Sequence, residues 1–225
     1  MQFLRPWAVA SIPRHAVAYK GKGHVRFSPM YVPRPCAEKG CGRPALAESD
    51  RCVVHHPDPA AHVREILRAA RTSGLHDLDL AGITLADEDL SGLEISGCRL
   101  TAATLTRVTL SRASIQLTFL DRATIRECDF AGVNILNAVF AGSHIEACPF
   151  AESEIIQGNF LGIRGVAVSF DHSDLYGSRF VGSWLEKVSM RDCNLTRAHF
   201  DSAHRDRIDF HLSNTNEAVF IEAEP

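Results

Sequence analysis

The sequence predicts an all-β solenoid, a rod of about 7.5 coils that follows a short cysteine-rich segment and a capping α-helix. Every fifth residue from Leu75 to Phe220 is large and apolar, except Gly165, Arg205 and Thr215. This period matches neither the helix nor the strand repeat, so the chain must turn a corner every five residues. Eight of the 15 glycines fall two residues after such a position, where a corner favours a residue that tolerates unusual backbone angles.

The phenylalanines indicate how many sides each coil has. Nine of the 12 lie at multiples of ten in the numbering. In a three-sided coil of about 15 residues they would stack alternately on isoleucine, whereas in a four-sided coil of about 20 residues they stack on one another. Like-on-like stacking gives every coil the same cross-section, so we expect a square coil with two columns: Phe130, Phe150, Phe170 and Phe210 in one, and Phe140, Phe160, Phe180, Phe200 and Phe220 in the other.

The position two residues before each repeat centre is mostly small or compact. Four of the seven cysteines occupy it, namely Cys98, Cys128, Cys148 and Cys193. A cysteine there serves as a compact core filler, and burial in apolar surroundings makes a thiol unreactive. We therefore expect no catalytic or redox role for these four thiols.

Residues 75–223 resemble the pentapeptide-repeat family, whose consensus is A-(D/N)-L-x-x. The resemblance rests on an unbroken frame and on pentads such as Cys98-Arg99-Leu100, Cys128-Asp129-Phe130, Ser173-Asp174-Leu175, Cys193-Asn194-Leu195 and Ala198-His199-Phe200. It implies a right-handed quadrilateral β-helix. The departures at Gly165, Arg205 and Thr215 predict local irregularity, above all in the last two coils, and Arg205 must find a partner or reach solvent.

The other three cysteines predict a metal site. Cys36, Cys41, Cys52 and His55 follow the spacing C-x4-C-x10-C-x2-H. Three thiolates and one imidazole satisfy tetrahedral Zn²⁺, and four protein ligands leave no open coordination position, so the expected role is structural. His56 is the rival fourth ligand, and the spacing leaves this choice open.

The predicted helix lies between this zinc-binding segment and the repeat. Residues 58–74 hold a capping Asp58, Pro59 for the first turn, an apolar stripe of Val63, Ile66, Leu67 and Ala70, and Gly74 after the last turn. A short amphipathic helix here is the expected lid for the first coil. The expected organisation is an irregular or β-hairpin segment over 1–34, a zinc knuckle over 35–57, the helix over 58–74 and the β-helix over 75–223.

The formal net charge of −3 conceals a division between a basic head and an acidic rod. Residues 1–74 hold 12 Lys or Arg against 5 Asp or Glu, and residues 75–225 hold 12 against 22, a net −10. One face of the rod is poor in charge and carries Phe119, Val139, Leu161, Val181 and Val219. We expect this face to be the contact surface if the rod has one.

No segment has the roughly 18 consecutive apolar residues of a membrane span, and prolines and arginines interrupt the first 17 residues, which makes them a poor signal peptide. We expect a cytoplasmic protein that does not bind a membrane. The common phosphate-loop, metalloprotease, esterase and dinucleotide-binding motifs do not occur in the sequence.

The leading expectation is a non-enzymatic scaffold that binds a protein partner whose identity the sequence leaves open. The family resemblance implies an alternative, a DNA mimic that binds a type II topoisomerase (gyrase) and protects it from toxins or quinolones. A second alternative is nucleic-acid binding by the basic head, through Lys20, Lys22, Arg26, Arg34, Lys39, Arg43 and Arg51. The irregular coils around Arg205 and Thr215 further suggest a homodimer through the carboxy-terminal coils.

Overall fold

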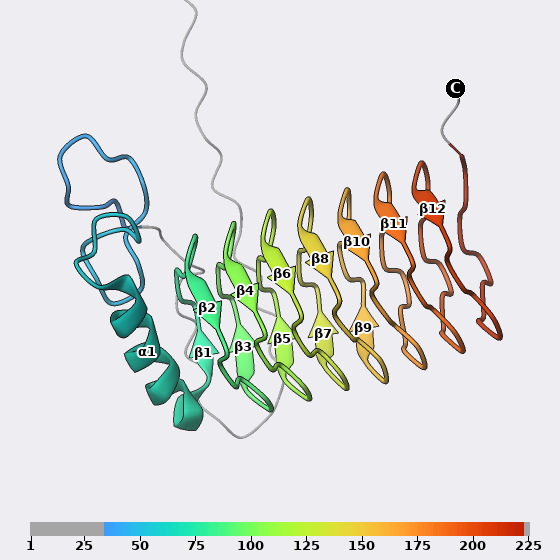
Figure 1. The fold of residues 1–225 in the computed structure, drawn as a ribbon, viewed down its shortest axis with the longest axis horizontal. Helices are drawn as coiled ribbons and strands as arrows, with labels where there is room; N and C mark the ends of the chain where they lie inside the picture. The colour runs from blue at the N-terminus through green and yellow to red at the C-terminus, as the bar shows by residue number, and fades with distance from the viewer. Residues whose placement is uncertain (1–33, 223–225) are drawn as a thin grey trace, which may run out of the picture.

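The computed structural model describes residues 34–222, which form a parallel β-solenoid of about seven turns with one helix at its amino-terminal end (Figure 1). Residues 1–33 and 223–225, and with them the expected hairpin around Lys20, lie outside the described residues. Within residues 34–222, no helix is long and apolar enough to cross a lipid bilayer.

Two sheets form two of the four faces of the rod, and every pair of neighbouring strands is parallel. The first has the order β1-β3-β5-β7-β9 and comprises β1 (Leu75–His76), β3 (Glu94–Ser96), β5 (Ser114–Gln116), β7 (Asn134–Leu136) and β9 (Glu154–Ile156). The second has the order β12-β11-β10-β8-β6-β4-β2 and comprises β2 (Thr84–Ala86), β4 (Thr104–Thr106), β6 (Thr124–Arg126), β8 (His144–Glu146), β10 (Arg164–Val166), β11 (Trp184–Glu186) and β12 (His204–Asp206).

The register between strands confirms the four-sided coil. Leu75 pairs with Ile95 on one face and Leu85 with Leu105 on another, each 20 residues along the chain. The other two faces are held by isolated bridges with the same offset, as between Phe119 and Val139. Since one offset of 20 applies on all four faces, each coil stacks directly on the one before it.

The corners explain the glycine pattern. Across residues 77–217, every residue two positions after a repeat centre has a positive φ, between 48° at Leu117 and 71° at Gly82. L-amino acids tolerate this left-handed region poorly, and β-branched residues tolerate it least. Accordingly, none of these corner positions is Val, Ile or Thr.

We expect Ala102→Val to lower the free energy of unfolding by about 1 kcal/mol, because a β-branched side chain is strained at the φ of 55° found there. Ala102 is exposed, so lost packing does not contribute. Chemical denaturation measures the change, with Thr104→Val on an extended strand as the control. Equal stabilities of the two variants would contradict a conformational requirement at the corner.

The predicted phenylalanine columns fill the core. Phe130 stacks on Phe150 at a centroid distance of 4.3 Å, and Phe140 stacks on Phe160 at 5.0 Å. The two columns also meet edge to face, as between Phe150 and Phe160 at 6.4 Å, the geometry that aromatic quadrupoles favour. These rings are fully buried.

The four cysteines of the repeat are buried, as expected for core fillers. Burial raises the pKa of Cys98 to about 11. Burial also raises the pKa of Cys193, although a backbone hydrogen bond from Ser173 partly opposes it. Such thiols hold little thiolate at neutral pH, and this accords with a packing role.

The expected irregularity is confirmed in the last coils. Arg205 is held near Glu222, with Nη2 and Oε1 3.5 Å apart, and its guanidinium lies 5.4 Å from the centroid of Phe220. Its side chain is 20% exposed, so it both finds partners and reaches solvent. Ile208 and Phe210, like Phe220, are only partly buried. Gly165 remains buried in the core because Leu185 lies in van der Waals contact with its position.

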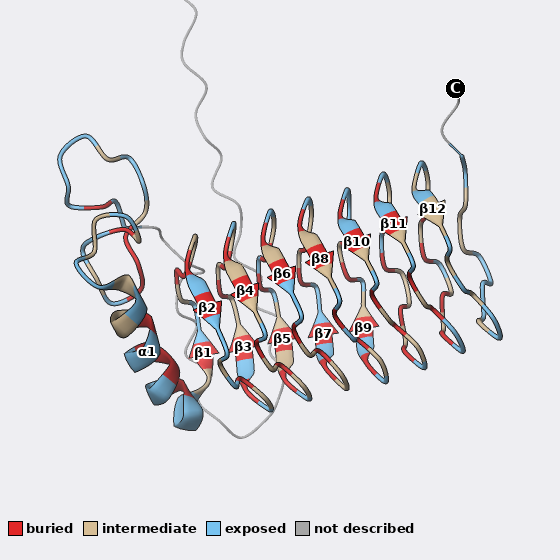
Figure 2. Ribbon diagram, in the orientation of Figure 1, coloured by how far each residue is buried: buried red, intermediate tan, exposed pale blue. Residues whose placement is uncertain are grey.

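The predicted cap is α1 (Pro59–Ser73). The Asp58 side chain accepts a hydrogen bond from the Ala61 amide, and the Gly74 amide closes the helix on the Ala70 carbonyl. The apolar stripe of Val63, Ile66, Leu67 and Ala70 is buried on the side that faces the coils (Figure 2). The helix therefore covers the core of the first coil, as expected.

Candidate metal centre and contact surface

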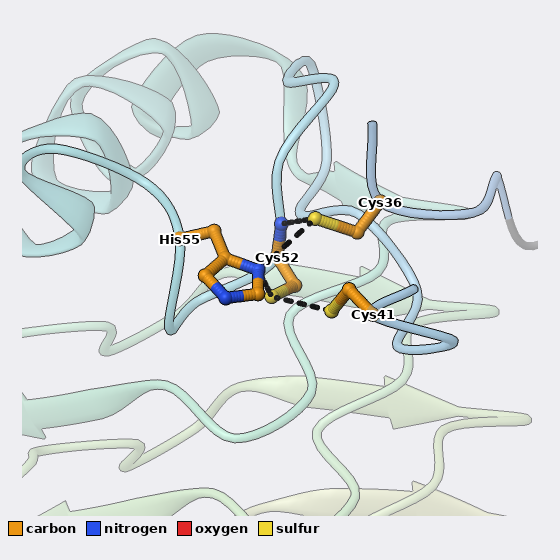
Figure 3. A group of neighbouring side chains, drawn as sticks. All are labelled: Cys36, Cys41, Cys52 and His55. Carbon is orange, nitrogen blue, oxygen red and sulfur yellow. Dashed lines mark hydrogen bonds between the residues drawn. The ribbon is translucent and has the colours of Figure 1, made fainter. Parts of the chain in front are cut away.

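Cys36, Cys41, Cys52 and His55 come together at the amino-terminal end of the rod (Figure 3). Their four ligand atoms all lie within 4.8 Å of one another. The Sγ atoms of Cys36 and Cys52 each lie 3.5 Å from Nδ1 of His55, and the Sγ atoms of Cys41 and Cys52 are 3.7 Å apart. Three sulfurs and one nitrogen thus point at one centre.

These separations fit a tetrahedral zinc ion. With Zn–S bonds of about 2.3 Å and a Zn–N bond of about 2.0 Å, two sulfurs lie about 3.8 Å apart and a sulfur and a nitrogen about 3.5 Å apart. The observed distances match these edges closely. Soft thiolates with one imidazole are also the donor set that zinc prefers.

Local backbone turns build the cluster. Gly40 and Gly42, with φ of 79° and 33°, let the chain turn around Cys41. The amide of Cys41 donates to the carbonyl of Glu38, and the amide of His55 donates to the carbonyl of Cys52. These two turns orient both pairs of ligands toward the same point.

The thiols are polarised unequally. Burial raises the pKa of Cys36, but backbone hydrogen bonds, first from the Cys52 amide at 3.3 Å, hold it below its ordinary value. The pKa of Cys52 is lowered in the same way, by amides that outweigh its burial. A backbone hydrogen bond from Arg43 lowers the pKa of Cys41, yet burial and the neighbouring thiols raise it overall. Clustered thiols compete for negative charge, and a bound cation removes that competition.

His56 lies outside the cluster. Its Nδ1 accepts a hydrogen bond from the Asp58 amide at 3.2 Å, and its ring lies on that of His62 with centroids 4.7 Å apart. His56 therefore belongs to the start of α1, and His55 is the imidazole that faces the thiols.

A second feature is an exposed apolar surface in the middle of the rod. Its members are Leu117, Phe119, Leu136, Val139 and Leu161, of which Leu117 is 57% and Phe119 45% exposed. The chain has no Asp, Glu, Lys or Arg at residues 116–119, 134–142 or 156–162, so charge is absent across this part of three coils. Exposed apolar groups without interspersed charge are typical of protein contact sites.

The sequence predicted only part of this apolar surface. Phe119, Val139 and Leu161 belong to the face that we expected to make contacts. Leu117 is a corner residue and Leu136 lies on the neighbouring sheet, so reading one face at a time missed both. Apolar residues at outward slots on both sides of one corner were the available signal.

Sequence reasoning also missed a stack on the second sheet. Trp184 lies against His204 with centroids 3.8 Å apart, and the Arg164 guanidinium lies 5.8 Å from the Trp184 centroid. Trp184 is 45% exposed. The spacing of 20 residues between these three side chains would have indicated that they are neighbours.

The basic head is described only in part. Arg34, Lys39, Arg43 and Arg51 are exposed, and the Arg51 side chain donates to the His55 carbonyl. Lys20, Lys22 and Arg26 lie outside the described residues.

Comparison with known proteins agrees with the repeat. The family described as pentapeptide repeats (8 copies) matches residues 173–204. Among solved structures, trypsin-treated QnrB1, a plasmid-mediated fluoroquinolone resistance protein, is 15% identical with a TM-score of 0.49, covering 67% of this chain and 86% of that one. A pentapeptide repeat protein from the thylakoid lumen of Arabidopsis thaliana is 18% identical with a TM-score of 0.35, covering 51% and 70%. One from the cyanobacterium Cyanothece is 9% identical with a TM-score of 0.34, covering 70% and 98%. No curated protein matches the sequence.

Proposed function

Because the rod of this chain is built from pentapeptide repeats, we propose that the protein is a non-enzymatic, cytoplasmic scaffold that binds a protein partner on the apolar surface. The observation that carries this proposal is the apolar surface itself, in which Leu117, Phe119, Leu136 and Leu161 are each more than a third exposed. Burying such groups against a partner is favourable, since each removes apolar area from water.

The rod suits this role because its backbone is rigid. Each coil pairs with both neighbours, so the exposed side chains keep fixed positions without a partner. A preorganised surface loses little conformational entropy on binding. The complementary partner presents an uncharged apolar patch, because charged groups would be desolvated there without an ion-pair partner.

We expect the double variant Phe119→Glu, Leu136→Glu to lose at least tenfold in partner capture, because two carboxylates would be buried at the contact. The measurement is a quantitative pull-down from the native host, with the full chain as bait. The matched control is Thr104→Glu, Ser111→Glu, which places the same charges at outward positions of other faces.

The two double variants carry equal charge, so a general electrostatic effect would reduce capture by both. Loss confined to the Phe119 variant supports the apolar surface. Equal capture by the wild type and that variant would contradict it.

The negative charge of the rod supports a second candidate, binding to a type II topoisomerase in place of duplex DNA. Residues 75–225 carry a net charge of −10 on a narrow rod, which is the sign that a DNA-binding groove attracts. The test is relief of quinolone inhibition in a gyrase supercoiling assay. No relief at any dose rejects this candidate.

The exposed Arg34, Lys39, Arg43 and Arg51 support a third candidate, nucleic-acid binding by the head. Lysine and arginine contacts to phosphates give a strongly salt-dependent affinity. A gel shift with DNA and RNA over a salt series tests this, and the absence of any salt-dependent shift removes it.

Two further assignments belong to this proposal. The Cys36, Cys41, Cys52 and His55 cluster holds a structural Zn²⁺, supported by its tetrahedral separations. A homodimer forms through the carboxy-terminal coils, supported by the partial exposure of apolar residues there. Ile221 is 66% exposed in this region, and Ile221→Asp should yield a monomer in light scattering if the dimer uses this end.

A further inference from the structure

Hydrogen bonds between coils follow one rule along the rod. On two opposite faces, the amide of each repeat centre donates to a carbonyl of the next coil. Leu80 donates to Arg99 at 2.8 Å, and Leu90 donates to Thr109 at 2.7 Å. The carbonyls of Asp79 and Asp89 hold the corresponding positions in the first coil, and the segments that precede that coil are the zinc-binding segment and α1.

The head supplies donors to both of these carbonyls. The amide of Ala47 donates to the Asp79 carbonyl at 2.7 Å, the distance found between true coils. On the opposite face, the Arg71 side chain donates to the Asp89 carbonyl. Leu46 and Ala47 are buried and join the core of the rod. The head therefore takes the place of a preceding coil at this edge.

The segment that donates to Asp79 is the loop between two metal ligands. Residues 42–51 connect Cys41 to Cys52, and Leu46 and Ala47 lie in the middle of this loop. Inside it, the amide of Leu46 donates to the carbonyl of Arg51 at 2.9 Å. A metal bound by Cys41 and Cys52 fixes both ends of the loop, and a segment this short lacks the core to order itself without one.

We propose that the metal centre controls the amino-terminal edge of the rod: bound metal holds Leu46 and Ala47 against the first coil, and metal loss releases that edge to pair with a second copy of this chain. The proposal rests on the zinc assignment made above. Exposed strand edges are templates for pairing with another chain.

The opposite end of the rod identifies a second copy as the occupant. Phe220 and Phe210 stand on the same two faces as Leu80 and Leu90, one coil register earlier than Asp79 and Asp89 would require. Their amides lie in the orientation that donates toward a following coil. Copies stacked end to end would thus continue the ladder, and such a head-to-tail contact does not close on itself.

The first experiment measures the weight-average mass of the full 225-residue chain by sedimentation, with zinc bound and after chelation. We expect the mass at least to double on chelation and to return when zinc is added. Far-UV circular dichroism should keep its β-sheet signal, because the coils themselves contain none of the ligands. An unchanged mass after proven loss of one equivalent of zinc overturns the edge proposal and leaves the zinc site standing.

The second experiment separates the edge from the metal. Ala47→Pro removes the N–H that donates to Asp79 but no ligand, so it should retain one equivalent of zinc and yet assemble with metal present. Glu48→Gly, at an exposed neighbouring position with φ of 57°, keeps the Ala47 amide and is the matched control. Leu46→Glu, which introduces a charge at a buried anchor, should assemble as well.

These variants also decide the case in which the zinc assignment fails. If the wild type binds no zinc, assembly of Ala47→Pro beside a non-assembling Glu48→Gly still supports the edge contact, while its dependence on metal is lost. If Ala47→Pro and Leu46→Glu both sediment as the wild type does, the edge contact is overturned whatever the metal content.

Discussion

Phe160→Ala is expected to lower the free energy of unfolding by about 3–5 kcal/mol, the cost of truncating a fully buried aromatic residue. Phe160 is completely buried and stacks on Phe140 at 5.0 Å and on Phe180 at 4.9 Å. It also meets Phe150 and Phe170 edge to face. The variant loses both the transfer free energy and these ring contacts, and the coils on either side cannot collapse because their backbones are paired.

Chemical denaturation followed by circular dichroism measures this change. Phe119→Ala is the matched control, because the same truncation is made at a side chain that is 45% exposed, where we expect a loss below about 1 kcal/mol. Similar losses for the two variants would show that the Phe140–Phe160–Phe180 column does not carry the stability of the rod.

The second large effect concerns the metal. We expect the purified chain to carry about one equivalent of zinc, and Cys52→Ser to lose it, because apparent binding free energies of structural zinc reach about 10–16 kcal/mol at neutral pH. Cys52 is the most buried of the three thiols, and its Sγ lies within 3.7 Å of both Cys41 Sγ and His55 Nδ1. Elemental analysis with a chelator competition measures content and affinity.

The two adjacent histidines supply an internal control for this experiment. His55→Ala should weaken zinc binding strongly, whereas His56→Ala should leave the metal content unchanged because His56 faces Asp58 and His62. Less than about half an equivalent of zinc in the wild type, or equal effects of the two histidine variants, would contradict the assignment.

The rod was predictable from the sequence because its period is local. A frame of five residues dictates which side chains point inward, and the spacing of phenylalanines by ten distinguishes a square coil from a triangular one. The structure confirmed both, with stacked rings from Phe130 to Phe170 and from Phe140 to Phe220.

The choice between His55 and His56 was not predictable. Both amides donate to the Cys52 carbonyl, at 3.0 and 2.9 Å, so the two residues share one turn and spacing alone cannot separate their side chains. Contacts between segments were equally hidden. The pairing of Ala47 with Asp79 joins parts of the chain that share no repeat, and no periodic pattern reports it.

The uniform offset of 20 residues between coils has a consequence for how such a rod can change. Removing or duplicating one coil shifts everything beyond it by about 4.8 Å along the axis and leaves each face in line. The separation between the head and the apolar surface can therefore change only in whole steps. The rod acts as a ruler whose graduations are set by backbone pairing, and the two features at its ends of measurement can be respaced without being redesigned.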